Sequence, residues 1–192
     1  PLSPHADPRL AGGAWLATPA AAALAPLFRA LALCHTVIPE VGSAGGGGGV
    51  AGPASTTTPP TDRDRDPHTI RYQAASPDEA ALVSAARDAG FALLARPPGA
   101  ITLLEPASQE PSTPPIPVTY DVLAVLEFSA ARRRQSVLVP RRRGECGGEG
   151  AAAGSALLLT KGADTTIEPL LDRGDPAATR HWPATAAHLA SF

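Results

Sequence analysis

The sequence predicts an α+β fold: a mainly antiparallel twisted sheet flanked by helices, with long disordered insertions. Residues alternate between two faces from Tyr120 to Phe128, and an arginine-rich turn separates this stretch from a strand-like Ser136–Val139. A second pair of strand-like segments flanks Pro97–Ala100, which has the composition of a turn. Helical patterns with start and stop signals lie before and after these hairpins. Hairpins joined by short turns imply antiparallel pairing.

Composition limits how much of the chain can pack. The 192 residues suffice for one domain with a core, but 22 prolines and 18 glycines indicate long loops. We expect a low-complexity lead-in at 1–25 and a domain at 26–192. Flexible insertions are expected at 42–67, 106–117 and 141–154. The net charge of −2 gives no overall field that would attract nucleic acid, and the missing initiator methionine suggests a fragment.

The first expected helix is Pro26–Cys34, with proline in its first turn and an apolar face that contains Leu27, Leu31 and Cys34. Cys34 and His35 have no second cysteine or histidine at a metal-ligand spacing. We therefore expect a buried cysteine beside a hydrogen-bonded histidine rather than a metal site or a nucleophile. A short strand is expected at Thr69–Gln73.

A second helix is expected to begin after Ser76. Serine as N-cap, proline next and Glu79 three residues after the cap have the spacing of a capping box. The apolar pattern continues to about Ala89, and Gly90 supplies a left-handed stop. Glu79 thus has a structural explanation that needs no ligand.

The strands come next in the chain. Phe91–Arg96 and Ile101–Glu105 form one expected hairpin, and the stretch from Tyr120 to Val139 forms the central one. Ala156–Thr160 is expected as a third strand, which follows the central hairpin in the chain.

Lys161-Gly-Ala-Asp follows that strand and is expected to open a helix. Asp164 has the position of an N-cap, and Gly162 would allow a sharp turn of the backbone. The expected buried face of this helix contains three apolar residues, Ile167, Leu170 and Leu171. A last helical pattern covers Thr185–Phe192.

Two features favour a charged, flat ligand. The aromatic ring of Phe128 lies next to Arg132–Arg134, and a ring beside fixed cations suits a ligand that contains a base and phosphates. Lys161 is the single lysine against fifteen arginines, which invites a functional explanation. Taken alone, however, such a ring is more often part of a core, and an arginine run is more often a solvated turn.

Five segments in chain order resemble the nucleotide-binding domain of P-type ATPases, specifically the type IV subfamily of phospholipid flippases. The segments are Leu31–Glu40, Ser76–Leu82, Tyr120–Val139, Leu158–Asp164 and Thr185–Phe192. The resemblance implies the same α+β fold, with a mainly antiparallel sheet and helices on its faces.

The resemblance also implies roles for four residues. Phe128 would stack on adenine, Glu79 would accept a hydrogen bond from the adenine amino group, and Lys161 would lie along the base and reach the phosphates. Arg133 takes the place of a usual lysine near the phosphates and offers a planar fork instead of a point charge. The implied cofactor is ATP with magnesium, whose protein ligands lie outside this fragment.

The resemblance implies a part of a pump rather than a whole enzyme. The phosphoacceptor aspartate of the family lies in an Asp-Lys-Thr-Gly-Thr motif, which does not occur here. We therefore expect no catalytic residue and no metal ligand in this chain, and no activity from the chain alone. The implied partners are the phosphorylation and membrane domains of the same pump and, through the membrane domain, a phospholipid. The implied location is the cytoplasmic face of a membrane.

Other functions remain as alternatives. The chain could be a non-catalytic nucleotide-binding or interaction module from a truncated gene, or the same domain of a cation-pumping relative. The glycine run after residue 42 lacks the Lys-Ser/Thr of a phosphate-binding loop, and the arginines lack the interleaved aromatic residues typical of nucleic-acid binding.

Overall fold

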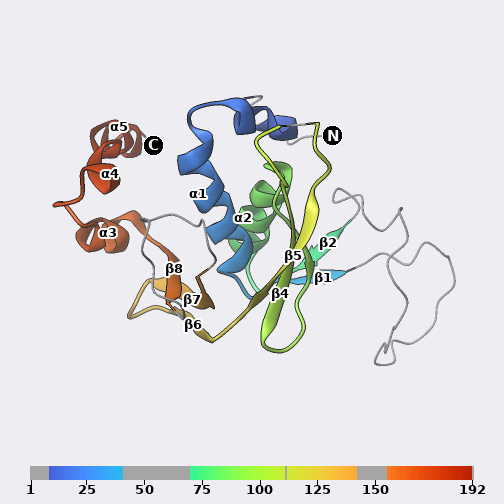
Figure 1. The fold of residues 1–192 in the computed structure, drawn as a ribbon. Helices are drawn as coiled ribbons and strands as arrows, with labels where there is room; N and C mark the ends of the chain where they lie inside the picture. The colour runs from blue at the N-terminus through green and yellow to red at the C-terminus, as the bar shows by residue number, and fades with distance from the viewer. Residues whose placement is uncertain (1–8, 41–69, 111, 142–154, 192) are drawn as a thin grey trace, which may run out of the picture.

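The computed structural model describes residues 9–40, 70–110, 112–141 and 155–191 (Figure 1). The expected insertion at 42–67 and nearly all of that at 141–154 lie outside these residues. The elements are η1 (Ala11–Ala17), α1 (Ala21–Leu33), β1 (Ile38–Glu40), β2 (Arg71–Gln73), α2 (Pro77–Asp88), β3 (Ala92–Ala95), β4 (Ala100–Glu105), β5 (Ile116–Asp121), β6 (Ala124–Ser129), β7 (Arg134–Pro140), β8 (Ala156–Gly162), α3 (Asp164–Ile167), η4 (Glu168–Leu170), α4 (Pro176–Thr179) and α5 (Trp182–Leu189).

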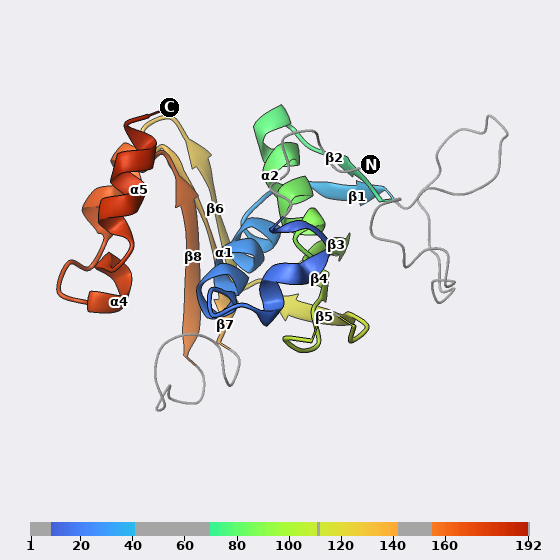
Figure 2. The same cartoon turned by 90° about the horizontal axis from the view of Figure 1, so that it is seen from above.

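The α+β class with antiparallel strands is confirmed, and the strands are divided among three sheets in the described part of the chain. β1 pairs with β2, β4 lies between β3 and β5, and β7 lies between β6 and β8. All of these pairs are antiparallel. Helices α1 and α2 pack against each other, and α3, α4 and α5 gather on the side of β8 away from α1 (Figures 1 and 2).

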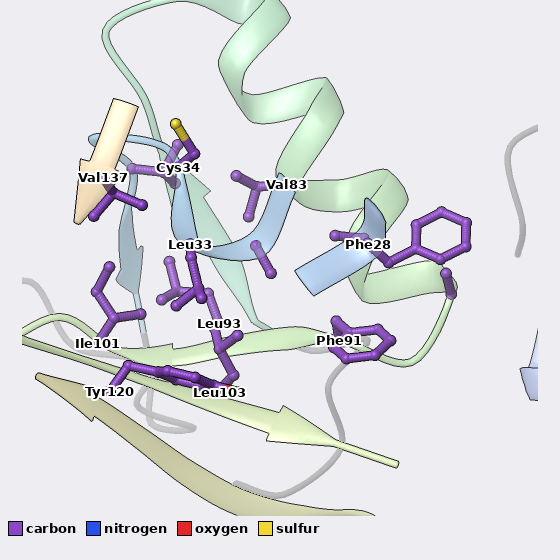
Figure 3. Close-up of a cluster of buried hydrophobic side chains, with 14 of the residues drawn as sticks. Phe28, Leu33, Cys34, Val83, Phe91, Leu93, Ile101, Leu103, Tyr120 and Val137 are labelled. Atoms are coloured by element: carbon purple, nitrogen blue, oxygen red, sulfur yellow. The ribbon is translucent and has the colours of Figure 1, made fainter. Parts of the chain in front are cut away.

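The core lies between α1, α2 and the two three-stranded sheets, and Figure 3 shows its central side chains. Trp15 of η1 also belongs to it, with its ring centroid 5.4 Å from that of Phe28 and 6.3 Å from that of Phe91. The indole N–H of Trp15 donates to the carbonyl of Ala89 at 3.2 Å, which satisfies its one buried polar group. Residues of the expected lead-in at 1–25 therefore contribute to the core.

Helix α1 differs from the helix expected at 26–34. It begins at Ala21, so Pro26 lies inside it rather than in its first turn. Alanine has the highest helix propensity of all residues, so the alanines before Pro26 offset the loss of the backbone hydrogen bond that proline cannot donate. The expected apolar face is also wrong in part, because Leu27 is half exposed whereas Phe28 is buried.

The hairpin β3–β4 confirms the expectation for residues 91–105. Helix α2 ends at Asp88 with Ala89 as its C-cap, and the predicted left-handed stop follows at Gly90, which has a φ of +101°. The expected continuous strand 120–128 is wrong. After β5, Val122 donates its N–H to the carbonyl of Gly99 and Leu123 donates to that of Leu138, both at 2.8 Å. The backbone therefore passes from one sheet to the next within two residues.

The helix after Asp164 is shorter and more exposed than expected, and the last helix is shifted along the sequence. The N-cap of α3 is Ala163, and Asp164 is the first helical residue, whose carboxylate accepts the N–H of Thr165 at 2.7 Å. No residue of α3, η4 or α5 is buried, so the expected buried face of the helix after Asp164 is wrong. The last helix begins at Trp182 instead of residue 185. Within the described residues, no helix combines the length and apolar character that a membrane span requires.

Candidate functional site

A bulge in β6 sets the direction of the Phe128 side chain. The register between β6 and β7 shifts by one residue between Leu126 and Ser129, so Glu127 and Phe128 both lie opposite Gln135. The partners of Leu126 and Ser129 are alternate residues of β7, which share one face of the sheet. Phe128 therefore lies on the opposite face, with Gln135, whereas strict alternation would place it on the face of Leu126.

Lys161 lies on the same face as Phe128. Its position in β8 pairs with Gln135 in β7, and directly paired residues of antiparallel strands point to the same side. The Phe128 side chain is 64% exposed, and every other residue of β6 is exposed as well. The alternative that Phe128 is a core residue is therefore excluded, and the ring forms an exposed apolar surface.

Glu79 does not form the expected capping box. Ser76 is the N-cap of α2, but its side chain makes no capping hydrogen bond. The Glu79 carboxylate instead accepts the backbone N–H of Thr36 at 2.9 Å and the hydroxyl of Thr36 at 2.7 Å. Glu79 Oε1 also lies 3.7 Å from Lys161 Nζ, in a pair whose side chains are only 12% and 18% exposed. Two donors and a cation outcompete the backbone N–H of Ser76 for this carboxylate.

These contacts keep Glu79 ionised. Partial burial alone would raise the pKa of Glu79, but the two hydrogen bonds from Thr36 and the charge of Lys161 outweigh it. The net pKa lies below the ordinary value, so the carboxylate is an acceptor without a proton at neutral pH.

The backbone of Arg133 contacts the chain just after Lys161, at the end of β8. It occupies the β6–β7 turn with a φ of +50°, and its carbonyl accepts the N–H of Ala163 at 3.2 Å. A methyl group at Gly162 would come within 2.6 Å of that same carbonyl oxygen. Gly162 is therefore required by this close approach between β8 and the turn, rather than by the sharp turn that was expected. The Arg133 side chain is exposed.

The expectation of a buried cysteine beside a hydrogen-bonded histidine is confirmed for Cys34 and His35. His35 Nδ1 accepts the N–H of Val37 at 3.1 Å and faces Arg96 Nη1 at 3.3 Å, so Nε2 carries the proton and donates to the Ala32 carbonyl at 2.7 Å. Burial and the nearby Arg96 lower the pKa of His35 to about 4. Burial raises the pKa of the Cys34 thiol, so the two residues do not form a thiolate–imidazolium pair.

The buried His35 should make the stability of the chain depend on pH. Its pKa is about 4 in the folded chain and near 6.5 when unfolded, so between these values the unfolded chain binds more protons. The free energy of unfolding should therefore be highest above pH 6.5 and fall toward pH 4, by on the order of 3 kcal/mol. Urea titrations across this range would measure it. His35→Gln should flatten the profile, and an unchanged slope in that variant would contradict the assignment.

Among the described residues, no group of three or more His, Cys, Asp or Glu side chains is placed to hold a metal ion. The candidate site combines the exposed ring of Phe128, the Glu79 carboxylate with its lowered pKa, the Lys161 ammonium and the Arg133 turn. These are the four residues to which the resemblance gave a role, and that role stays a prediction. The sequence did not identify Thr36, which was visible only as one position in the Leu31–Glu40 segment.

Comparisons with known proteins identify the family. No family model matches the chain. Over 186 residues, 97% of the chain, it is 32% identical to the protein named Probable phospholipid-transporting ATPase 7 of Arabidopsis thaliana. It is 46% identical over 113 residues, 59% of the chain, to phospholipid-transporting ATPase IC of Mus musculus. It is 34% identical over 84% of its length to phospholipid-transporting ATPase DRS2 of Saccharomyces cerevisiae.

The chain spans only 8% to 12% of the length of these three relatives. The similarity therefore concerns one segment of much longer proteins. With matches of more than 30% identity across most of its length, the chain belongs to the type IV P-type ATPases, the phospholipid-transporting ATPases.

Proposed function

We propose that this chain is the nucleotide-binding domain of a phospholipid-transporting ATPase, and that it presents ATP with magnesium to an aspartate outside this chain. The domain would cover the expected residues 26–192 together with η1 and the start of α1, which share its core. The observation that carries the proposal is the exposed ring of Phe128 on the same sheet face as Lys161. A large exposed aromatic side chain is costly in a purely structural role, and it offers a base a flat apolar surface.

The four residues fit the parts of ATP by their chemistry. Phe128 would stack on the adenine ring, and the ionised Glu79 would accept a hydrogen bond from the adenine amino group. Lys161 would extend along the base toward the phosphates, and Arg133 would supply a second cation from the adjacent turn. Magnesium would come with the phosphates, held by ligands outside this chain.

The rest of the pump completes the proposed function. Its phosphorylation domain would contain the aspartate that takes the γ-phosphoryl group, and its membrane domain would move the phospholipid. This domain would lie on the cytoplasmic face of the membrane and would have no role in nucleic-acid binding.

Titration of the 192-residue chain with ATP tests the proposal. One exposed stack and few charged contacts should give a dissociation constant on the order of 0.1 to 1 mM. Amide NMR shifts should concentrate around Phe128, Lys161 and the Arg133 turn. No phosphate should be released, since the phosphoacceptor motif is absent from this sequence. Absence of ATP-dependent shifts at millimolar ATP, or steady phosphate release, would refute the proposal.

Lys161→Met should weaken ATP binding by about 1–3 kcal/mol, the contribution of a charge-assisted contact to phosphate. The change retains most of the aliphatic stem. The Lys161 ammonium lies 3.7 Å from Glu79, and the Glu79 carboxylate keeps both hydrogen bonds from Thr36 in this variant, so the free energy of unfolding should change by about 1 kcal/mol or less. Calorimetric titration and urea unfolding measure the two effects.

Two controls make this result specific. Lys161→Arg keeps the charge and should recover part of the lost affinity, whereas Arg180→Met removes an exposed cation after α4 and should leave binding unchanged. An unaltered dissociation constant in Lys161→Met would remove the lysine from the site.

A further inference from the structure

Thr36 contacts Glu79 in a way that no assigned role explains. Its backbone N–H donates to Oε1 and its hydroxyl donates to Oε2, so one residue engages both oxygens of the carboxylate. Thr36 and Glu79 are 43 positions apart in the chain: Thr36 lies in the connection between α1 and β1, and Glu79 lies in the first turn of α2. A carboxylate held at both oxygens cannot rotate freely about its terminal bond, so its remaining lone pairs point in fixed directions.

The residues before Thr36 fix its position in turn. The Cys34 thiol donates to the carbonyl of Gln135 at 3.3 Å, which ties this segment to the central strand β7. His35 donates to the Ala32 carbonyl at the end of α1 and accepts the N–H of Val37. Cys34 and His35 are both buried, and Thr36 is exposed. Thr36 therefore holds Glu79 from a segment that is anchored on both a helix and a sheet.

The two carboxylate oxygens of Glu79 differ in how many further hydrogen bonds they can accept. Oε1 receives the N–H of Thr36 and lies 3.7 Å from Lys161 Nζ. In the described part of the chain, Oε2 has the Thr36 hydroxyl as its one hydrogen-bond partner. A carboxylate oxygen can accept about two hydrogen bonds, so Oε2 keeps one free acceptor position.

We propose that Thr36 is a specificity-determining positioning residue, which aims Glu79 Oε2 at the exocyclic amino group of a 6-aminopurine nucleotide. This proposal rests on the proposed function as a nucleotide-binding domain and deepens it. A 6-oxo purine presents an oxygen at the same place, and that oxygen would face an ionised carboxylate without a proton to share. Without the threonine hydroxyl, Glu79 could turn toward Lys161 or water, and discrimination between the two kinds of base would fall.

The test compares ATP with inosine triphosphate, which differs at the purine 6-position. Dissociation constants for both are measured on the 192-residue chain and on Thr36→Val, which keeps the shape and the backbone N–H but lacks the hydroxyl. The parent chain should bind ATP about tenfold more tightly, as one hydrogen bond to a charged group provides. In Thr36→Val this preference should fall at least about threefold through weaker ATP binding alone, because inosine triphosphate never used that contact.

Two further variants separate positioning from general damage. Thr36→Ser retains the hydroxyl and should restore the preference for ATP. Thr102→Val removes a hydroxyl that pairs with Thr119 at 3.0 Å in the β3–β5 sheet, and it should leave both affinities unchanged.

Each other outcome overturns the proposal in a recognisable way. An unchanged preference in Thr36→Val would show that the hydroxyl has no part in base selection. Equal loss of affinity for both nucleotides would show a structural role only. If the parent chain binds neither nucleotide, the proposed function fails together with this inference. If the parent binds both with equal affinity, nucleotide binding stands and the selection by Thr36 and Glu79 is refuted.

Discussion

Phe128→Ala should weaken ATP binding by roughly 1–3 kcal/mol while the free energy of unfolding changes little, and Phe91→Ala should do the reverse. The two rings differ in burial rather than in chemistry, since Phe128 is 64% exposed and Phe91 is 2% exposed. Truncation of a buried phenylalanine leaves a cavity in a packed core and costs about 3–5 kcal/mol. Truncation of an exposed ring removes little buried area, and the loss appears only when a base would stack on it.

Urea unfolding and ATP titration on both variants measure these effects. Phe128→Trp provides a control, because a larger ring at the same exposed position should retain stacking. A Phe128→Ala chain that unfolds at much lower urea concentration would show that the ring supports the core after all. A Phe128→Ala chain that binds ATP normally would remove the aromatic surface from the site.

Local sequence signals predicted the elements that depend on neighbouring residues. The β3–β4 hairpin follows from the turn at Pro97–Ala100, and the end of α2 follows from Gly90. The β6–β7 hairpin was predicted by apolar alternation and by the arginine-rich turn, and a strand was predicted at Ala156–Thr160, which forms most of β8. In each case, the residues that decide the structure lie within a few positions of one another.

Features that depend on distant partners were not predicted. β1 pairs with β2 across about thirty intervening positions, with Ile38 opposite Gln73, and neither strand has a turn signal that announces the other. The capping box failed for the same reason, because Glu79 accepts its hydrogen bonds from Thr36, which lies far away in the sequence between α1 and β1. Local propensity describes one contact that a side chain could make, whereas the fold decides which of several competing contacts it does make.

The candidate site combines residues that local sequence signals predicted with an arrangement that only the fold determines. Phe128 and Lys161 were singled out by residue type, but they share a face of the sheet only because of the bulge in β6. Strict alternation along β6 would place Phe128 on the other face. A bulge of one residue reverses the direction of every side chain that follows it, so no period-two pattern can reveal it. Arg133 was expected to act through its side chain, and the structure adds a backbone contact with Ala163 that fixes the turn beside Lys161.

Arg29→Leu should destabilise the chain by about 3–5 kcal/mol, although Arg29 lies outside the site. Arg29 of α1 donates through Nε at 3.2 Å and Nη2 at 2.9 Å to Oε2 of the buried Glu105 at the end of β4. The hydroxyl of Tyr120 donates to the other oxygen, Oε1, at 2.6 Å. Removal of the guanidinium would leave a buried carboxylate without its cation, and that penalty exceeds the value of the pair itself. Urea unfolding at pH 7 measures the loss.

A matched surface pair shows why burial decides the size of this effect. Arg173 Nη2 lies 3.0 Å from Glu168 Oε1, but these side chains are 60% and 44% exposed. Arg173→Leu should therefore cost about 1 kcal/mol or less. The double variant Arg29→Leu with Glu105→Leu removes both buried charges and should recover much of the stability lost in Arg29→Leu, because no uncompensated charge remains. A loss in Arg29→Leu no larger than in Arg173→Leu would show that water reaches Glu105 and that α1 is held to the β3–β5 sheet by apolar packing alone.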